Sequence, residues 1–215
     1  MLRYIGWIWP QQAQRQFSTL KEGKPPAILF AAIANPVPQY SGTRHNVGNW
    51  ALDQVQKGRS DVPPFKSSRT YRGYSASEPS ELNAVFLKST QSYMNLQGRP
   101  ISKAWSQFKK AYPNHSAAMV ILHDEIQIPL GKIQIRRQNT SARGHNGLRS
   151  IDSTIGPVYT KIGIGVGKPD NIPVDKHVLS KFCSDELEVL TGESLPQIKA
   201  IIDDMLQGKY IYDKQ

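Results

Sequence analysis

Two continuous apolar segments of strand length restrict the fold of this chain more than any other feature of its sequence. They are residues 27–33 (AILFAAI) and 117–122 (AAMVIL). A strand that is apolar along its whole length has both faces buried, which occurs where helices cover both sides of a sheet. Elsewhere, apolar residues recur every three or four positions over 47–55 and 101–112, the spacing of amphipathic helices. The alternation of the two patterns predicts an α/β domain.

Other segments refine this expectation. Residues 82–87 are a further strand candidate, and residues 131–137 and 160–166 alternate apolar residues with polar ones or glycine. The last two segments have a hairpin-like spacing, which favours a mixed sheet over a purely parallel one. Residues 57–80 and 138–147 are rich in polar and turn-forming residues and predict irregular loops. We therefore expect a single domain with a twisted mixed β-sheet flanked by helices.

The first 25 residues differ in composition from the rest. Arg3 and Arg15 lie among aromatic and apolar residues, and no acidic residue precedes Glu22. A basic, acid-free leader of this kind resembles a mitochondrial transit peptide; the alternative is a loosely packed extension of a cytoplasmic protein. We expect residues 1–25 to be such an N-terminal extension and residues 26–215 to form one domain, because a segment of this length is typical of a single domain.

Several classes of protein lose support because their signatures are missing. The single Cys183 cannot form an internal disulfide, and no apolar run approaches the roughly 18 residues of a membrane span. The sequence has no GxxxxGK[ST] phosphate loop, no GxGxxG after a strand, no HExxH and no GxSxG. This argues against nucleotide hydrolysis, zinc proteolysis and the usual serine-hydrolase route.

The charge of the chain points to its partners. The formal net charge is +10, and most of the excess lies in residues 57–110, with ten basic and three acidic residues, and in residues 128–168, with seven basic and one acidic. Such a balance favours a nucleic acid, an anionic membrane surface or an acidic substrate. The alternative is a generally basic surface without a partner.

Polar residues follow the apolar strands, at the edge where open α/β sheets place their sites. They are Asn35, His45, Asn95, Asp124 and Asn146. A histidine can take a proton from water, and a carboxylate bonded to its other nitrogen fixes its tautomer. Asparagine amides can hold a carbonyl or its oxyanion at any pH because they do not titrate. Each residue alone is also common in caps and turns, so only the set suggests a site.

The same residues lie in motifs that resemble the bacterial-type peptidyl-tRNA hydrolases, as a eukaryotic, organellar or fungal-like member. The motifs, in order, are Asn35-Pro36 with Tyr40 and residues 43–48 (TRHNVG), residues 93–95 (YMN) with Gly98, residues 123–125 (HDE) with Pro129 and Gly131, residues 144–151 (GHNGLRSI), and residues 162–165 (IGIG) before Lys168-Pro169. The resemblance covers about residues 27–205.

This resemblance implies a single-domain α/β fold with a mixed sheet, and an enzyme that hydrolyses the ester between a peptide and the 3′ end of tRNA, recycling peptidyl-tRNA released from ribosomes. It implies that His45 is the catalytic histidine and Asp124 its partner, and that His45 activates a water. Asn35 or Asn95 would hold the peptide backbone or the oxyanion, and Asn146 would position the water. No metal or cofactor is implied, and we expect a monomer.

The resemblance also implies residues that bind the substrate. Tyr40 and Met94 would lie beside its terminal nucleotide and peptide. The positions that match the family's clamp for the 5′-terminal tRNA phosphate are Arg136 and Lys161, with Arg137 an adjacent candidate, although any one of these could instead belong to an exposed strand face.

The sequence departs from the family pattern at a few positions. Val37 replaces a common glycine, which predicts strain in the turn after Pro36, because a β-branched residue disfavours positive φ. Ser89 replaces a usual proline, Gln97 a common serine, and Arg143 a glycine, where it could contact phosphate or narrow the site. Two alternatives remain: an RNA-binding protein on the same fold without hydrolysis, as in a plant organellar splicing factor, and an esterase for small substrates.

Overall fold

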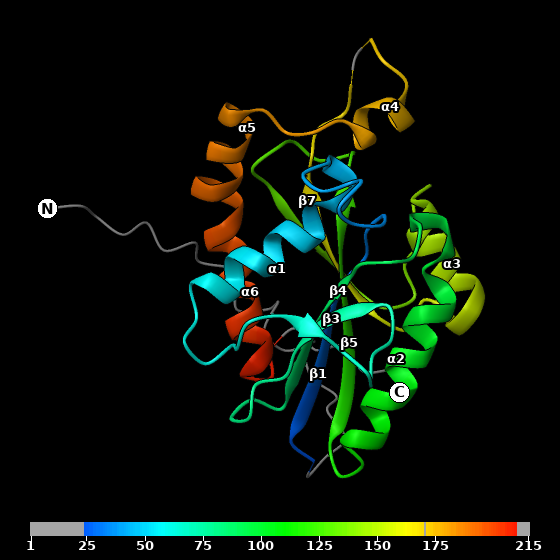
Figure 1. Ribbon diagram of the computed structural model, residues 1–215, viewed down its shortest axis with the longest axis vertical. Coiled ribbons are helices and arrows are strands. Elements are labelled where there is room, and N and C mark those ends of the chain that lie inside the picture. The colour runs from blue at the N-terminus through cyan, green and yellow to red at the C-terminus, as the bar shows by residue number, and fades with distance from the viewer. Residues whose placement is uncertain (1–23, 170, 210–215) are drawn as a thin grey trace, which may run out of the picture.

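The computed structural model describes residues 24–169 and 171–209, which build one seven-stranded sheet in the order β2-β3-β4-β1-β5-β7-β6 (Figure 1). The four central strands, β4, β1, β5 and β7, are parallel. The outer strands are antiparallel: β3 pairs with β4, β2 with β3, and β6 with β7. The strands are β1 (Pro26–Ala32), β2 (Lys66–Ser67), β3 (Tyr74–Ser77), β4 (Ala84–Ser89), β5 (Ser116–Glu125), β6 (Ile133–Arg136) and β7 (Thr160–Gly165). This arrangement confirms the expected mixed α/β sheet.

Helices cover both faces of the sheet. Helices α1 and α6 lie on one side, and α2 and α3 lie side by side on the other (Figure 1). The helices are α1 (Val47–Lys57), α2 (Gly98–Ala111), α3 (Asn146–Ile155), α4 (Val174–Leu179), α5 (Ser184–Val189) and α6 (Leu195–Leu206), with short turns η2 (Arg44–Asn46), η3 (Met94–Leu96) and the π-helical η4 (Leu190–Ser194). Each face therefore has its own apolar layer, as continuous apolar strands require.

The central strand β1 belongs to both layers. Ile28 and Phe30 face the α1–α6 layer, whereas Leu29 and Ala31 face the α2–α3 layer. The Phe30 ring stacks on Phe86 of β4, with ring centroids 5.0 Å apart. All side chains from 27 to 34 are buried, which explains why this segment is apolar at every position.

Residues 57–80 are more regular than their composition predicts. They contain β2 and β3, and β3 pairs with β4 in antiparallel register. These strands have two and four residues, too short for an alternating pattern to stand out among polar neighbours. Helix α3 was also not predicted, because the polar loop before it continues without a break into its first turn.

A close helix–strand approach sets the position of the chain just before α1. At Gly48, in the first turn of α1, an added Cβ would come 2.8 Å from the carbonyl oxygen of Leu122 in β5. Glycine is required there because any side chain would push the helix away from the strand. The tight packing brings η2, directly before α1, to the carboxyl end of β5.

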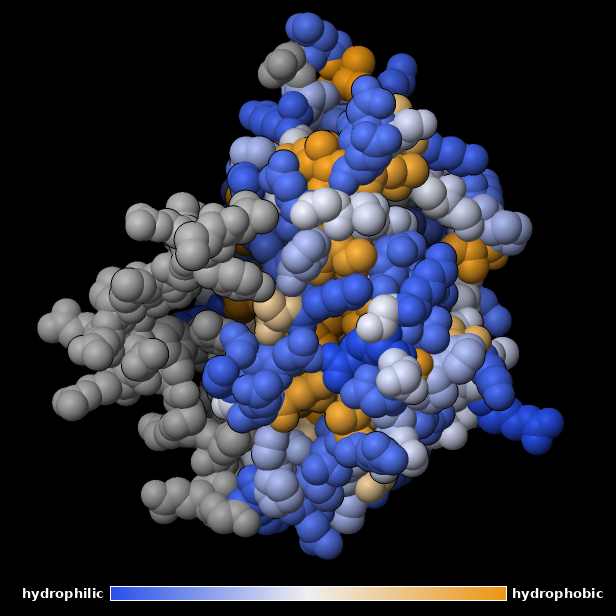
Figure 2. Space-filling model, turned by 90° about the vertical axis from the view of Figure 1, so that its left-hand side faces the viewer, coloured by the Kyte–Doolittle hydropathy of each residue, from blue (hydrophilic) through white to orange (hydrophobic). Residues whose placement is uncertain are grey.

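The face over α1, α5 and α6 is mostly hydrophilic, with apolar residues in small separate groups (Figure 2). Helix α6 turns its apolar stripe, Ile198, Ile202 and Met205, into the core. No described helix is long and apolar enough to cross a membrane. Of the predicted leader, residues 1–23 lie outside the described residues, and the division into an extension and one domain stays a prediction.

Candidate active site

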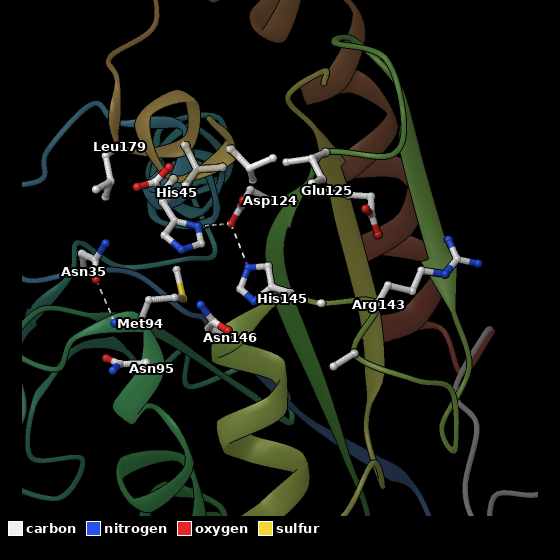
Figure 3. A pocket seen from close by; sticks show the side chains of 16 residues that line it. Asn35, His45, Met94, Asn95, Asp124, Glu125, Arg143, His145, Asn146 and Leu179 are labelled. Atoms are coloured by element: carbon white, nitrogen blue, oxygen red, sulfur yellow. Dashed lines mark hydrogen bonds and ion pairs between the residues drawn. The ribbon is translucent and has the colours of Figure 1, made fainter. Parts of the chain in front are cut away.

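A pocket of about 520 Å³ opens at the carboxyl ends of the central parallel strands (Figure 3). Asn35 follows β1, Asp124 lies near the end of β5, and Met94 and Asn95 belong to η3, which follows β4. Neighbouring parallel strands end at the same edge, so their loops converge there. The structure thus brings together polar residues that are almost 90 positions apart in the chain.

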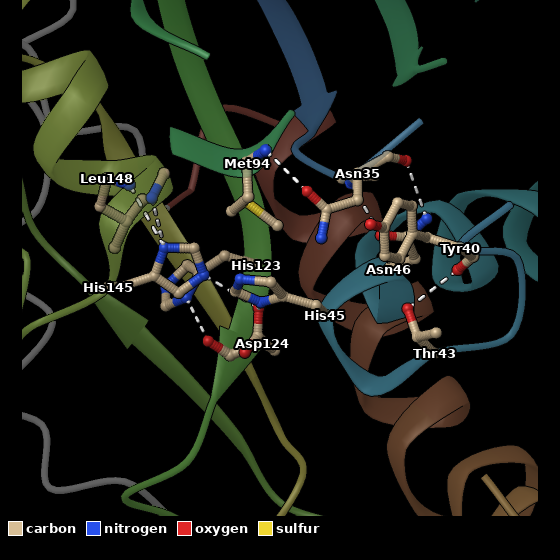
Figure 4. Close-up of polar contacts among 12 residues, drawn as sticks. Asn35, Tyr40, Thr43, His45, Asn46, Met94, His123, Asp124, His145 and Leu148 are labelled. Atoms are coloured by element: carbon tan, nitrogen blue, oxygen red, sulfur yellow. Dashed lines mark hydrogen bonds and ion pairs between the residues drawn. The ribbon is translucent and has the colours of Figure 1, made fainter. Parts of the chain in front are cut away.

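Asp124 is the buried centre of this pocket. Its Oδ1 atom lies 2.7 Å from Nδ1 of His45 and 2.9 Å from Nε2 of His145 (Figure 4). Burial by itself raises the pKa of Asp124, but the adjacent His145 and His45 lower it more, so the pKa lies well below its usual range. Asp124 is therefore an ionised carboxylate that accepts from two imidazoles.

The partners of the two histidines give them different abilities. An ionised carboxylate only accepts, so Nδ1 of His45 carries a hydrogen and its Nε2 is the basic nitrogen. His145 uses both nitrogens: Nε2 donates to Asp124, and Nδ1 accepts from the backbone N–H groups of Gly147 and Leu148, 3.1 and 3.3 Å away. His145 caps α3 in this way. His45 can accept a proton from a water, whereas His145 has no free acceptor nitrogen.

A third histidine, His123, is buried next to this pair but takes no part in the pocket. Burial, and to a smaller extent the neighbouring His145, lowers the pKa of His123 to about 3. Its Nδ1 lies 2.7 Å from the backbone oxygen of Asp124, and its ring packs edge-on against His145. His123 is thus a neutral packing residue behind the site.

Asn35 is held in one orientation by its neighbours. Its backbone N–H donates to Oδ1 of Asn46, and Nδ2 of Asn46 donates to its carbonyl oxygen, at 2.8 and 3.0 Å. Its side-chain Oδ1 accepts from the backbone N–H of Met94 at 2.8 Å. The amide oxygen is therefore occupied, and Nδ2, which has no partner among the described residues, is the group offered to the pocket (Figure 4).

Gln97 fastens the loops around Asn35 from behind. It is fully buried, and its Nε2 donates to the carbonyl oxygen of Ala34 at 2.7 Å and to Oγ of Ser89 at 3.1 Å. It also donates to the carbonyl oxygen of Ser92 at 3.1 Å. One side chain thereby ties together the ends of β1 and β4 and the segment before η3.

The other expected substrate residues occupy different parts of the pocket. Met94, Asn95 and Asn146 line it, Met94 buried and the two asparagines exposed (Figure 3). Tyr40 does not line it; its ring meets Tyr93 edge-on, with centroids 6.3 Å apart.

The four expected phosphate-binding residues do not form one exposed group. Arg143 lines the pocket and is exposed, and Arg137 is exposed outside it. Arg136 is buried, donates from Nη1 to the carbonyl oxygen of Ser141 at 2.8 Å, and lies near Glu125. Lys161 is fully buried, with its Nζ 4.2 Å from the centre of the Tyr159 ring.

Two departures from the family pattern have unequal backbone consequences. Val37 is not among the residues with positive φ, so the prediction of backbone strain at Val37 is wrong. Arg143 has a φ of 46°, in the left-handed region that favours glycine. The strain therefore lies at Arg143, beside the pocket, in a backbone conformation that a glycine would adopt without strain.

The turn η2, which contains His45, is anchored to the segment that follows α4. Nη2 of Arg44 lies 2.5 Å from Oε1 of Glu186, and Nη1 donates to Oγ of Ser180 at 2.6 Å. Arg44 is buried by these contacts, so His45, the next residue, sits on a fixed backbone. Val174 and Leu179 of α4 line the opposite wall of the pocket and are exposed.

Among the described residues, His45, Asp124 and His145 form one group whose ligand atoms lie within 4.8 Å of one another, as a metal site would require. In the hydrogen-bonded arrangement, the two imidazole nitrogens that face Asp124 both carry hydrogens. A metal ion would have to displace both, and His145 would have to give up its cap on α3. The geometry fits an acid–base pair better than a ligand set.

Sequence reasoning missed His145 and Asn46 as members of the site. Both lie in quoted motifs, beside Asn146 and His45. Their roles depend on contacts at sequence separations of 21 and 11 residues, which only the packing of α3 and α1 against the sheet creates. The sequence signal that could have found His145 is its position directly before a helix, where an acceptor side chain caps the first turn.

Comparisons with known proteins indicate the family of this chain. A family model described as peptidyl-tRNA hydrolase matches residues 29–214. The chain is 35% identical over 183 residues to a peptidyl-tRNA hydrolase of Saccharomyces cerevisiae, covering 79% of this chain and 91% of the yeast protein. It is 34% identical over 195 residues to one of Methylocella silvestris, covering 87% and 95%. A crystal structure of peptidyl-tRNA hydrolase from Acinetobacter baumannii superposes with a TM-score of 0.65 at 26% identity, covering 87% of this chain and 96% of that one.

Proposed function

The chain belongs to the peptidyl-tRNA hydrolase family, and we propose that His45, held by Asp124, is the general base with which it hydrolyses the ester of peptidyl-tRNA. One observation carries this assignment. Nδ1 of His45 lies 2.7 Å from a buried, ionised carboxylate, which leaves its basic Nε2 as the free ring nitrogen of a residue that lines the pocket. His145 lines the same pocket but has no free acceptor nitrogen.

The reaction follows from this arrangement. Nε2 of His45 takes a proton from a water, and the water oxygen attacks the ester carbonyl carbon. The carbonyl oxygen becomes an oxyanion, and the bond from carbon to the 3′ oxygen of the terminal ribose breaks. The imidazolium returns its proton to that ribose oxygen, so the products are a peptide carboxylic acid and a free tRNA 3′ end. Asp124 stabilises the imidazolium between the two transfers.

Asparagines supply hydrogen bonds that do not depend on pH. Because Oδ1 of Asn35 is occupied by Met94, its Nδ2 is oriented to donate to the oxyanion or to the peptide carbonyl. Asn95 and Asn146, which are exposed at the pocket, would hold the peptide backbone and the attacking water. Met94 would contact the peptide, and Tyr40, whose ring meets Tyr93 outside the pocket lining, would contact the terminal nucleotide.

Contact with tRNA phosphate would begin at the exposed Arg143 and Arg137 and reach Arg136 and Lys161 beneath the 138–144 loop. Nε and Nη2 of Arg136 and Nζ of Lys161 are buried without a hydrogen-bond partner among the described residues. Such cations favour an anion. An arriving phosphate could reach them if the contact between Arg136 and Ser141 opened.

The decisive assay compares two substrates and two histidines. Wild-type protein should release the acyl group from N-acyl-aminoacyl-tRNA but not from aminoacyl-tRNA with a free amino group. His45→Ala should abolish release, whereas His115→Ala, in a histidine directly before β5 and outside the pocket lining, should keep it. Tight tRNA binding with no release at any enzyme concentration would refute the assignment and revive the RNA-binding alternative, which the family matches do not favour.

We further propose that residues 1–25 direct the protein to mitochondria and that it acts as a monomer. Support for the targeting is the basic, acid-free composition of the leader. Fused to a fluorescent reporter, these residues should carry it to mitochondria. A diffuse cytosolic signal would count against the targeting, and a dimer in sedimentation against the monomer.

A further inference from the structure

We infer that an exposed cationic surface on α2 and the loop before β3 binds the sugar-phosphate backbone of the tRNA at a distance from the ester. This inference rests on the proposed function. The α2 surface comprises Arg69, Arg72, Arg99, Lys103 and Lys110, all exposed. None of them lines the catalytic pocket.

The sequence of both segments is free of carboxylates. Residues 66–72 and 98–111 together contain seven basic residues and no acidic residue. On α2 the exposed cations Arg99, Lys103 and Lys110 recur at i, i+4 and i+11, which places them on one face, opposite the buried Ile101, Ala104 and Phe108. A helix of 14 residues is about 21 Å long, so the cations form an extended row.

The fold adds the loop residues to this row. Arg69 and Arg72, between β2 and β3, line one hollow together with Lys103 of α2. Three cations that converge on a hollow repel one another, and an anion relieves that repulsion. Tyr71, on the same hollow, is buried, and its burial together with the charge of Glu78 raises its pKa to about 12, so it adds no negative charge at neutral pH.

The cations of the α2 surface keep their charge unneutralised, because they have no carboxylate partners among the described residues. None of the five forms an ion pair with a carboxylate in the part of the chain that the structure describes. By contrast, Arg44, Arg59, Lys88 and Lys132 are each paired with an aspartate or glutamate. An extended row of unpaired cations is suited to a polyanion, because each phosphate contact releases a counterion.

The row starts beside the active site. Asn95, at the pocket, is three residues before the first residue of α2, and the backbone N–H of Gly98 donates to Oγ of Ser150 in α3 at 3.0 Å. From there α2 runs away from the pocket (Figure 1). A nucleic-acid duplex carries about one phosphate per 3.4 Å of axis on each strand, so a tRNA whose 3′ end lies in the pocket can place several phosphates along α2.

A membrane surface fits these observations less well. Proteins that lie on membranes insert large apolar side chains between the cations. The exposed large apolar residues of the described chain are Val37, Tyr93, Leu96, Ile172, Val174, Leu179 and Leu187. None of them lies in residues 66–72 or 98–111.

The test removes charge from the α2 surface and, separately, from elsewhere. The variant Arg69→Gln/Arg72→Gln/Lys103→Gln is compared with Lys24→Gln/Lys57→Gln/Lys132→Gln, three exposed lysines outside the α2 surface, which lowers the net charge equally. Binding of deacylated tRNA is measured by fluorescence anisotropy over a series of salt concentrations. We expect the first variant to bind about tenfold more weakly and its salt slope to fall by about two to three units, one per lost phosphate contact. The control should stay within about twofold of wild type.

A short substrate, an N-acyl-aminoacyl ester of the trinucleotide CCA, separates this surface from the catalytic site. Both triple variants should hydrolyse it like wild type. The double variant Lys103→Gln/Lys110→Gln leaves the loop before β3 intact and replaces the triple variant if that protein fails to fold. Its salt slope for tRNA binding should also fall, but by less. Failure of wild type to hydrolyse any substrate would overturn the proposed function but not this surface.

Three results would overturn the inference. Equal losses of tRNA affinity in the triple variant and its control would reduce the effect to net charge. Loss of hydrolysis of the short substrate would place the defect in the pocket. Unchanged tRNA binding with lost binding to vesicles of anionic phospholipid would make the surface a membrane contact.

Discussion

Gln97 donates its side-chain amide to the hydroxyl oxygen of Ser89 at 3.1 Å, and these are two of the positions at which the sequence departs from the usual family residues. The two departures thus touch each other in the buried layer behind Asn35. The glutamine reaches the carbonyl oxygens of Ala34, after β1, and of Ser92, before η3, and the serine hydroxyl at the end of β4 accepts a further hydrogen bond. Through these hydrogen bonds the pair connects the ends of β1 and β4.

Replacing this glutamine by the common family residue, Gln97→Ser, should destabilise the protein by about 1–3 kcal/mol, because it leaves a void and removes the donor to the buried oxygen of Ala34. Urea unfolding measures the change. In a double-mutant cycle with Ser89→Ala, Gln97→Ala should show a coupling of about 0.5–1.5 kcal/mol. Purely additive effects would mean that the two side chains do not support each other.

His145 can be tested by separating its two hydrogen-bonding roles. His145→Asn keeps an acceptor that caps α3 but cannot reach Asp124, so stability should change by no more than about 0.5 kcal/mol. We expect kcat to fall about tenfold with little change in KM.

The matched variant His145→Ala loses the cap as well and should cost about 1 kcal/mol more in unfolding free energy than His145→Asn. An unchanged kcat in both variants would show that His145 does not support Asp124.

The sequence predicts best what depends on burial alone. The segments 27–33 and 117–122 become β1 and β5 because their side chains are apolar at every position. Asn35 and Asp124 follow or end these strands, so their convergence follows from the parallel topology. Prediction fails where a structure depends on partners rather than composition. Strand β3 exists because β4 offers an edge to pair with, and β2 in turn pairs with β3.

In the candidate site, too, the features that the sequence does not predict are those that depend on contacts between elements. A basic residue such as Lys161 is expected at the surface from its chemistry alone, yet the pairing of β7 with both β5 and β6 encloses it. The tautomer of His145 follows from donors on α3 and an acceptor on β5. No local pattern contains this information, because it depends on the packing of one element against another.

His123 should make the protein less stable in mild acid. Its pKa is lowered to about 3 in the folded protein from 6.5, so between these values the unfolded chain binds a proton that the folded chain does not. Stability therefore falls as the pH drops below 6.5, by about 2 kcal/mol at pH 5 from this residue. His123→Asn, whose amide can still donate to the carbonyl of Asp124, should lose correspondingly less stability between pH 7.5 and 5 in urea titrations.

Asp124 acts in a different range, because its pKa is lowered: its contribution to stability is present above its usual pKa and is lost only as the pH falls below about 4. The acid loss between pH 7.5 and 5 therefore does not come from Asp124. Equal pH dependence of wild type and His123→Asn over that interval would rule out His123 as its source.

Lys161 should lower the stability of the fold at neutral pH. Burial lowers its pKa to about 8 from 10.5, so the unfolded chain holds its proton more tightly, and the cost is present in full below about pH 8 and disappears above 10.5. Lys161→Met should therefore stabilise the protein by about 1–3 kcal/mol at pH 7, and the difference from wild type should shrink between pH 8 and 10. If Lys161 also receives the tRNA phosphate, the same variant should bind tRNA more weakly with a lower salt slope, whereas Lys161→Arg should keep the slope. A stabilised variant with unchanged tRNA binding would remove Lys161 from the tRNA path and leave its charge without a function.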